Sequence, residues 1–525
     1  MKKWFYVLTA LLLVTTIVSA CGKASEPSST SSANGTGDAV TGSKATNTTL
    51  TIAMGTDMVS FDIHDHNNTS TEAIHVNLFN YLFKFDENQQ LQPELAESYK
   101  LVDDTTWEIT LRQGVKFHDG TELTAEDVKF TLERVAKDSA LREHPNYKQI
   151  LEVKVLEDYK VQILTDGPQP ALLNRLARLG SGILPKAYIE EKGWETFLEH
   201  PIGTGPYQFV EWVRDDRVVL ERFTDYYFGG NEEWERVVFR VIPEASTRVN
   251  ELLTGGVQIA MNVPPNDWER IDNNDGTHVA LAESNRVMFL VVRHTEGTPT
   301  ADPRVREAID YAIDDKALAE QLLGGAGVPT RTRVTPGNIG ANPNLYNDYL
   351  YDPEKAKTLL AEAGYPNGLT LTLHSPQGRY LQDREVAEMI VAYLGQVGIQ
   401  VNLDFMEWSN FVEMRKAKNN KELYLIGIGN SLFDADLVVD FYHSQRAAGE
   451  IDYANAEVDQ LIEAARINMN AEEREKQYQR IQEIIAEDRP HIHLYLQKSN
   501  YGVSDSIQFA PRLDEMIIAT EIKRK

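Results

Sequence analysis

The chain has 525 residues, of which 42% are hydrophobic and 25% charged, and its formal net charge is −27. This length exceeds what one compact core can hold, so we expect at least two domains. The acidic excess argues against nucleic-acid binding, which needs concentrated Lys and Arg, and against electrostatic attachment to anionic lipids. The single cysteine, Cys21, excludes intramolecular disulfides and cysteine-rich zinc sites.

The N-terminus has the pattern of a secretory signal. Two lysines precede an apolar run from Trp4 to Val18, which is short for a membrane span of about 20 residues. The motif VSAC, ending at Cys21, resembles a bacterial lipobox, which implies a lipoprotein signal peptide over 1–20 and lipidation of the cysteine thiol. A plain signal peptide with an incidental cysteine is the alternative. Residues 21–48, rich in Ser, Thr and Gly, are expected to form a flexible linker.

The most informative stretch of the folded chain is 91–135. Apolar and polar residues alternate over Trp107–Leu111, which predicts a strand with one buried face. An Asp-Gly dipeptide at 119–120 then predicts a turn. Thr124 is a helix N-cap candidate, and Asp127 three residues later completes a capping-box pattern. The local prediction is therefore strand, turn and helix.

Helices and strands follow one another in the second half of the chain. Asp352 and the proline after it are typical of a helix start. The helical and alternating patterns predict helices over 353–363, 383–397, 458–467 and 472–487, and strands over 399–405 and 491–497. This succession is typical of an α/β domain.

Several longer motifs resemble one family. They are PELAES, Trp-x-Ile-x-Leu-Arg-x-Gly, VKFHDG, AEDV, GTGPY and RVREAIDYAI. Together they resemble the family 5 extracellular solute-binding proteins, which serve peptide and nickel ABC importers. The resemblance implies a two-lobed α/β fold like that of periplasmic binding proteins (type II, large cluster with an extra subdomain), closing on a ligand like a hinge. The implied division is a lobe I core of 49–93, 203–285 and 495–525, an extra subdomain of 94–202, and a lobe II of 286–494, with crossing strands near 285 and 494.

The same resemblance implies where a ligand would bind. Dipeptide receptors of this family clamp the ligand's carboxylate with an Arg and its ammonium with an Asp. The Arg position falls on Arg379, whose planar guanidinium suits a carboxylate, although a surface Arg capping a loop is the alternative. The Asp position falls on Ser431 and an aromatic position on Ile428. Because a neutral Ser cannot neutralise a buried ammonium, a free dipeptide is disfavoured.

Other predicted ligand contacts are less specific. Tyr380 and Trp408 offer stacking surfaces or core packing. Asp434 and Asp436 match a loop feature of the family. Either could bind an ammonium in place of the family's Asp only if that loop follows a different path here. The remaining predicted contacts are Asn430, His66 and Asn67. The segment His64-Asp65-His66 suggests metal, but no compact group of further ligands follows it, so we expect neither a metal nor a cofactor.

The favoured function is that of a substrate-binding lipoprotein of an ABC importer. We expect a monomer, lipid-anchored on the outer face of the cell membrane, that captures a peptide-like small solute and delivers it to a membrane permease. A surface receptor that senses a ligand without importing it is one alternative. A secreted hydrolase is another, but the sequence has no G-x-S-x-G, no H-E-x-x-H and no cysteine after Cys21, so we expect no enzyme activity.

Overall fold

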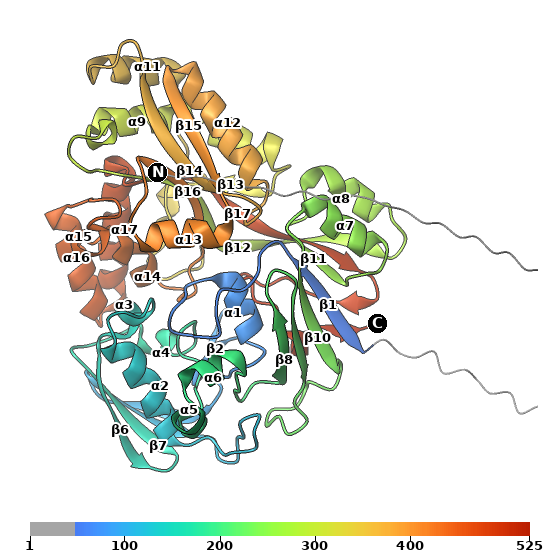
Figure 1. Cartoon of the computed structure of the whole chain (residues 1–525). Coiled ribbons are helices and arrows are strands. Elements are labelled where there is room, and N and C mark those ends of the chain that lie inside the picture. The colour runs from blue at the N-terminus through green and yellow to red at the C-terminus, as the bar shows by residue number, and fades with distance from the viewer. Residues whose placement is uncertain (1–47) are drawn as a thin grey trace, which may run out of the picture. The chain divides into compact units, whose positions relative to one another are not determined.

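The structure is a computed structural model that describes residues 48–525 (Figure 1). The predicted signal peptide, Cys21 and all but the last residue of the predicted linker lie outside these residues. Within 48–525, no helix is both long and apolar enough to cross a membrane.

One large mixed sheet extends through most of the described chain. Its strands lie in the order β15 (Ile399–Met406), β14 (Leu369–Pro376), β16 (Leu423–Ile428), β12 (Thr277–Val292), β17 (His491–Ser504), β11 (Ile259–Met261), β1 (Thr49–Met54), β10 (Arg236–Val241), β9 (Arg217–Arg222) and β8 (Tyr207–Val213). A further short strand, β13 (Gly327–Pro329), pairs with β17.

The two long central strands, β12 and β17, connect the two halves of this sheet. They pair in antiparallel fashion from Thr277 and Ser504 to Val291 and His491, with a register shift between Ala282 and Arg286. The apolar run Val287–Val292 of β12 is fully buried, as expected for a strand covered on both faces. The strands predicted near 285 and 494 are therefore present and lie side by side.

A separate four-stranded sheet forms with the stretch 91–135. Its order is β4 (Ala96–Asp103), β5 (Thr106–Leu111), β7 (Lys160–Thr165) and β6 (Ile150–Glu157). Ile109 and Leu111 are buried, so the predicted strand with one buried face is confirmed. Helix α2 (Ala125–Lys137) follows, and the carboxylate of Asp127 accepts a hydrogen bond of 2.9 Å from the Thr124 N–H, which confirms the predicted helix start.

The helices predicted in the second half of the chain are present: α12 (Asp383–Gln396) lies along the strands β14 and β15, and α16 (Ala456–Ile467) and α17 (Ala471–Asp488) pack against each other away from these strands (Figure 1). The Asp352 side chain accepts from the N–H of Lys355, as predicted for this helix start. The other main helices here are α9 (Pro303–Ala312), α11 (Pro353–Glu362) and α13 (Trp408–Lys416). Shorter helices elsewhere are α1 (Thr69–His75), α3 (His144–Tyr147), α4 (Leu172–Arg175), α5 (Lys186–Lys192), α6 (Trp194–Glu199), α7 (Ala245–Leu253), α8 (Pro265–Asp272), α14 (Ala435–Val439) and α15 (Ser444–Ala447).

Buried apolar side chains form three large clusters that occupy different parts of the sequence. One cluster draws on residues 287–496, around β12, β14 and β16. A second combines residues 50–79, 184–261 and 501–522. The third draws on residues 82–183, beneath α2 and the four-stranded sheet. Burial of these apolar surfaces is the main stabilising contribution to the fold.

Candidate functional site

A cavity of about 310 Å³ is lined by residues from the three sequence regions that form the three apolar clusters. One wall comes from residues 59–69 before α1, and another from residues 142–178 around α3 and α4. The rest comes from β12, from β16 and other segments between residues 379 and 446, and from Asp514. A concave site of this size can hold a small solute.

Basic side chains are concentrated around this cavity, although the chain as a whole is acidic. The lining bases are Arg142, Arg178, Arg286, Arg379, Arg415, Lys416 and Arg446, and the lining acids are Asp65, Glu143, Glu413, Asp440 and Asp514. Most of the bases are paired, in the combinations Arg178–Glu143, Arg286–Glu515, Arg415–Glu450, Lys416–Asp65 and Arg446–Asp440. Within residues 48–525, Arg142 and Arg379 have no ion-pair partner. The cavity is therefore suited to an anion.

The loop that carries Arg379 is held in place by Asp383 at the start of α12. The Asp383 carboxylate accepts hydrogen bonds from the backbone N–H groups of Gly378 at 2.9 Å, Arg379 at 2.8 Å and Tyr380 at 2.9 Å. Burial nevertheless raises the pKa of Asp383 to about 6. Gly378 has a φ of +81°, which an L side chain rarely adopts, so glycine fits this tight turn.

The side chain of Arg379 lies at the cavity and is only 7% exposed. Its guanidinium carbon is 4.9 Å from the ring centre of Tyr380 and 5.3 Å from that of Trp408. Its Nε has no hydrogen-bond partner among the described residues, and burial together with Arg286 lowers its pKa. A buried guanidinium without a carboxylate is costly, and an anionic ligand would supply the missing partner. That role remains a prediction.

Tyr380 and Trp408 both line the cavity beside Arg379. The Tyr380 hydroxyl donates to the Gly427 carbonyl at 2.9 Å, and the same carbonyl accepts from Arg286 Nη1 at 2.8 Å. A Cβ on Gly427 would clash with Met288 Sδ, so the close packing of this wall requires glycine. Trp408 lies edge-on to Tyr380, with ring centres 6.0 Å apart. These contacts hold the Tyr380 ring in a defined position at the cavity.

Ser431 also lines the cavity, and its hydroxyl already has a cationic partner. Arg178 Nε donates to Ser431 Oγ at 2.9 Å, while Arg178 Nη1 donates to Glu143 at 2.7 Å. Arg178 and Glu143 are buried, so their charges are weakly screened. A cation of the protein therefore lies beside Ser431, the residue at which the family resemblance predicts the ammonium-binding position. Placing a second cation beside it is unfavourable.

A larger cavity of about 830 Å³ shares Arg178, Ser431 and Asp514 with the first. These three residues therefore form the boundary between the two spaces.

Three of the predicted contacts are not among the residues that line the first cavity: Asn430, Asp434 and Asp436. Asn430 is fully buried and its amide donates to the Asp434 carbonyl at 3.0 Å. Asp434 accepts from Arg474 at 2.6 and 2.8 Å. Asp436 is paired with Arg175 and Arg466. Both carboxylates are thus already engaged within the protein, and their predicted contact with a ligand remains untested.

His66 and Asn67 line the cavity, and His66 begins a chain of hydrogen bonds. The Asn68 backbone N–H donates to His66 Nδ1 at 3.2 Å, so the ring proton of neutral His66 must be on Nε2. His66 Nε2 then donates to His75 Nδ1 at 3.3 Å, and His75 Nε2 donates to the Ser60 carbonyl at 3.0 Å. Burial keeps both rings neutral, lowering the pKa of His75 to about 3.

Possible ligand atoms of His66, Glu72 and His75 lie within 4.8 Å of one another, the spacing of a metal site. However, the two ring nitrogens that would bind the ion are already joined by a hydrogen bond. Coordination through His66 Nε2 would also move the ring proton to Nδ1, where it would face the Asn68 N–H. The group is better suited to a hydrogen-bonded network than to a metal.

Sequence reasoning missed the arginines that surround the cavity: Arg142, Arg178, Arg286, Arg415 and Arg446. One of them had a usable signal, because Arg286 directly precedes the six apolar residues of the run 287–292. A charge at the edge of a buried strand usually has a specific partner. For the others the local sequence has no comparable signal.

Comparison with known families identifies the family of this chain. The sequence model described as "Bacterial extracellular solute-binding proteins, family 5 Middle" matches residues 90–450. The chain belongs to the family 5 extracellular solute-binding proteins. It is therefore a solute-binding protein of an ABC importer and not an enzyme.

Individual relatives of this solute-binding protein cover most of its length. The chain is 31% identical over 461 residues to the glutathione-binding protein GsiB of Escherichia coli O157:H7, which covers 86% of this chain and 89% of the relative. It is 25% identical, with a TM-score of 0.82, to the oligopeptide-binding protein AppA of Bacillus subtilis in complex with a nonapeptide, covering 91% of this chain and 99% of that one. It is also 25% identical, with a TM-score of 0.82, to the ABC transporter-associated binding protein DppA of Helicobacter pylori in complex with the peptide STSA, covering 91% and 98%. The solute-binding protein thus has the two-lobed α/β fold of periplasmic binding proteins.

Proposed function

We propose that this solute-binding protein captures a small, anionic, peptide-like solute in the cavity at Arg379 and delivers it to a membrane permease. The observation that carries the proposal is the buried Arg379 guanidinium, which has no ion-pair partner within residues 48–525. A carboxylate fits its planar fork with two charge-assisted hydrogen bonds. Relatives named for glutathione and for bound peptides support a peptide-like solute.

The ligand would be enclosed by closure of two lobes. We propose lobe I as 49–93, 203–285 and 495–525, with an extra subdomain at 94–202, and lobe II as 286–494; the three separate apolar clusters support this division. Contacts between these proposed parts include Asn174 Nδ2 to the Leu432 carbonyl at 3.0 Å and Lys416 to Asp65 at 3.7 Å. A solute that contacts both lobes would favour the closed form by its differential affinity.

The protein would be held at the outer face of the membrane by a lipid on Cys21. The support is the lipobox-like VSAC motif, together with a family whose members are extracellular. Anchoring through two or more acyl chains is stable where one chain is marginal. We propose that the anchored protein acts as a monomer.

Native mass spectrometry of protein purified from its host tests the proposed function. We expect a small acid to co-purify with the parent and with Arg384→Ala, a control on the exposed face of α12. Arg379→Ala should be recovered folded and empty. Co-purification of a basic solute, or an undiminished yield of solute from Arg379→Ala, would contradict the proposal. A strain lacking the gene should fail to take up the identified acid, and unchanged uptake would instead indicate a sensing receptor.

A further inference from the structure

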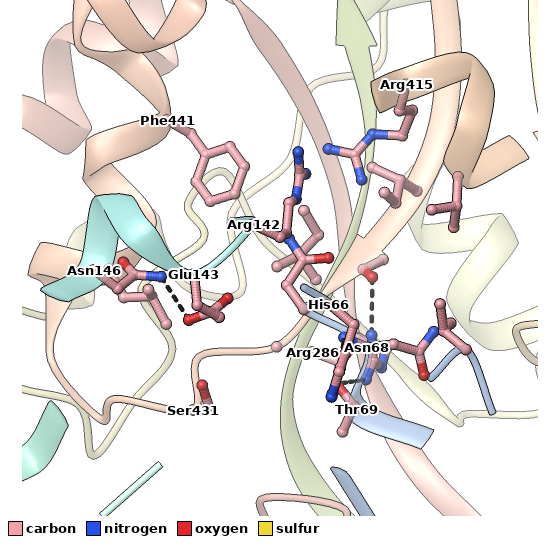
Figure 2. Close-up of a pocket in the computed structure, with 18 of the residues that line it drawn as sticks. His66, Asn68, Thr69, Arg142, Glu143, Asn146, Arg286, Arg415, Ser431 and Phe441 are labelled. Carbon is pink, nitrogen blue, oxygen red and sulfur yellow. Dashed lines mark hydrogen bonds between the residues drawn. The ribbon is translucent and has the colours of Figure 1, made fainter. Parts of the chain in front are cut away.

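Arg142, in the loop before α3, is the second lining base without an ion pair. It makes no hydrogen bond or salt bridge with any residue in the described range 48–525. Figure 2 shows its guanidinium next to that of Arg415, with the ring of Phe441 facing the same space. Burial and the nearby charges of Arg415 and Arg446 lower the pKa of Arg142 to about 10.

A further positive charge lies close to Phe441. Two guanidinium groups lie over the Phe441 ring, with Arg446 Cζ 5.1 Å and Arg333 Cζ 4.6 Å from its centre. Arg333 is only 2% exposed, and no carboxylate among the described residues forms an ion pair with it. The positive potential at this part of the cavity is therefore larger than the lining residues alone suggest.

The carboxylates near Arg142 are already used by other groups. Glu143 accepts from Arg178 at 2.7 Å and from Asn146 at 2.9 Å. Glu450 accepts from Arg415 at 3.2 Å and from the Tyr424 hydroxyl at 2.5 Å. Asp440 accepts from Arg466 at 2.5 Å, and its contact with Arg446 is longer, at 3.9 Å. Since these three carboxylates are engaged elsewhere, an anion from outside the protein is the natural partner of Arg142.

This group of cations differs from the one around Arg379. The charged groups that most affect Arg379 are Arg286, Glu515 and Asp383. Those that most affect Arg142 are Arg415, Arg446, Glu450 and Glu143. The Arg379 guanidinium lies over Tyr380 and Trp408, whereas that of Arg446 lies over Phe441, so the cavity has two separate places for negative charge.

We propose that Arg142, Arg415 and Arg446 form a second anion-binding subsite beside Phe441, so that the solute carries two anionic groups. One group would bind at Arg379 and the other here, with the solute's carbon skeleton against the partly exposed Phe441 ring. This inference rests on the proposed function and narrows its solute class to diacids, such as a short peptide with a second carboxylate. The position of Arg178 beside Ser431 agrees with it, since that pair disfavours a cationic group.

Bromide, located by its anomalous scattering in crystals, tests the subsite even while the solute is unidentified. The full purified chain is first freed of bound solute by unfolding and refolding. In the parent we expect one bromide in contact with Arg142 and Arg415 and a second at Arg379. Arg142→Gln should lose the first and keep the second. If the parent has no bromide beside Arg142, or if Arg142→Gln keeps it, the second subsite is wrong. A bromide beside Arg142 with none at Arg379 would contradict the proposed function alone.

A solution measurement with sulfate complements the crystals. Sulfate should raise the melting temperature of the parent, and Arg142→Gln should need about tenfold more sulfate for the same rise. Arg384→Gln, whose exposed guanidinium is 3.0 Å from Glu388, is the matched control and should behave as the parent. Equal sulfate dependence in the parent and Arg142→Gln would overturn the inference.

Discussion

Arg178 Nε donates a hydrogen bond of 2.9 Å to Ser431 Oγ, and thereby joins segments separated by 253 positions in the sequence. The same guanidinium is neutralised by Glu143, so the Arg178 charge needs no ligand. A site that binds an ammonium here would present an acid to the cavity. This protein presents a serine occupied by its own cation, which agrees with the basic lining of the cavity.

The first prediction concerns this contact. Ser431→Ala removes a hydrogen bond to a charged donor across the cavity, while Arg178 keeps its pair with Glu143. We expect solute affinity to fall by about 1.5 kcal/mol, or roughly tenfold, with little change in the stability of the empty protein. Titration calorimetry and thermal melting measure the two quantities. An unchanged affinity would mean that the contact plays no part in the closed, ligand-bound form.

The second prediction concerns Glu72, whose pKa is raised by burial to about 7 from its ordinary 4.5. Between pH 4.5 and pH 7, the Glu72 carboxyl is protonated in the folded protein and ionised in the unfolded chain. The resulting stabilisation is complete below pH 4.5 and is lost as the pH rises through 7. Glu72→Gln stays neutral throughout, so it should gain stability relative to the parent between pH 5 and pH 8.

The expected relative gain is on the order of 3 kcal/mol. Urea denaturation of both proteins at each pH measures it, and taking the difference cancels the titration of the buried histidines. Tyr81 and Arg178, which act on this carboxyl, are the same in both proteins. A difference in unfolding free energy that does not change with pH would contradict the prediction.

The local parts of the fold could be predicted because their signals are contiguous in the sequence. The alternation over Trp107–Leu111 is enough to predict β5, and the capping pattern that begins at Thr124 is enough to predict where α2 starts. Arg379 could be placed at the cavity through the family's motif around it. Arg142 and Arg415 could not, because they reach the cavity from distant segments and only the tertiary fold brings them together.

The ion pairs of the predicted site carboxylates also could not be predicted from the sequence. Asp434 and Asp436 are charged, lie two positions apart and belong to a motif that resembles one of the family, which made them reasonable ligand contacts. Their partners come from other elements: Arg474 from α17 and Arg175 from α4. A carboxylate's availability for a ligand depends on such partners, and these are not visible in one segment of sequence.

The third prediction concerns the loop of Arg379. Asp383→Asn leaves a single acceptor oxygen for three backbone N–H groups, so at least one buried donor loses its partner. We expect a loss of about 1–3 kcal/mol in unfolding free energy and weaker solute binding, because Arg379 is less well positioned. Glu385→Gln, which removes one negative charge from an exposed position in the same helix turn, is the control. Equal effects of both substitutions would show that helix charge, and not the loop, is responsible.

The fourth prediction concerns anchoring. Cys21 is the only residue able to carry a lipid thioether, so Cys21→Ala should leave the protein unprocessed or release it into the medium. Ser25→Ala, a change in the predicted linker, should be anchored normally. Fractionation with mass measurement of the mature protein distinguishes these results. A membrane-bound Cys21→Ala protein of normal mature mass would contradict the lipobox interpretation.

The most direct test of the central claim is calorimetric titration of the solute identified by mass spectrometry into three empty proteins: the parent, Arg379→Ala and Arg384→Ala. If Arg379 binds a carboxylate in a cavity closed to water, its removal leaves that carboxylate desolvated and unpaired. We expect a loss of about 2–5 kcal/mol, or roughly one to four decades in affinity, for Arg379→Ala, and less than a twofold change for Arg384→Ala. Binding of the solute to Arg379→Ala within a few-fold of the parent would contradict the claim that this cavity captures an anion through Arg379.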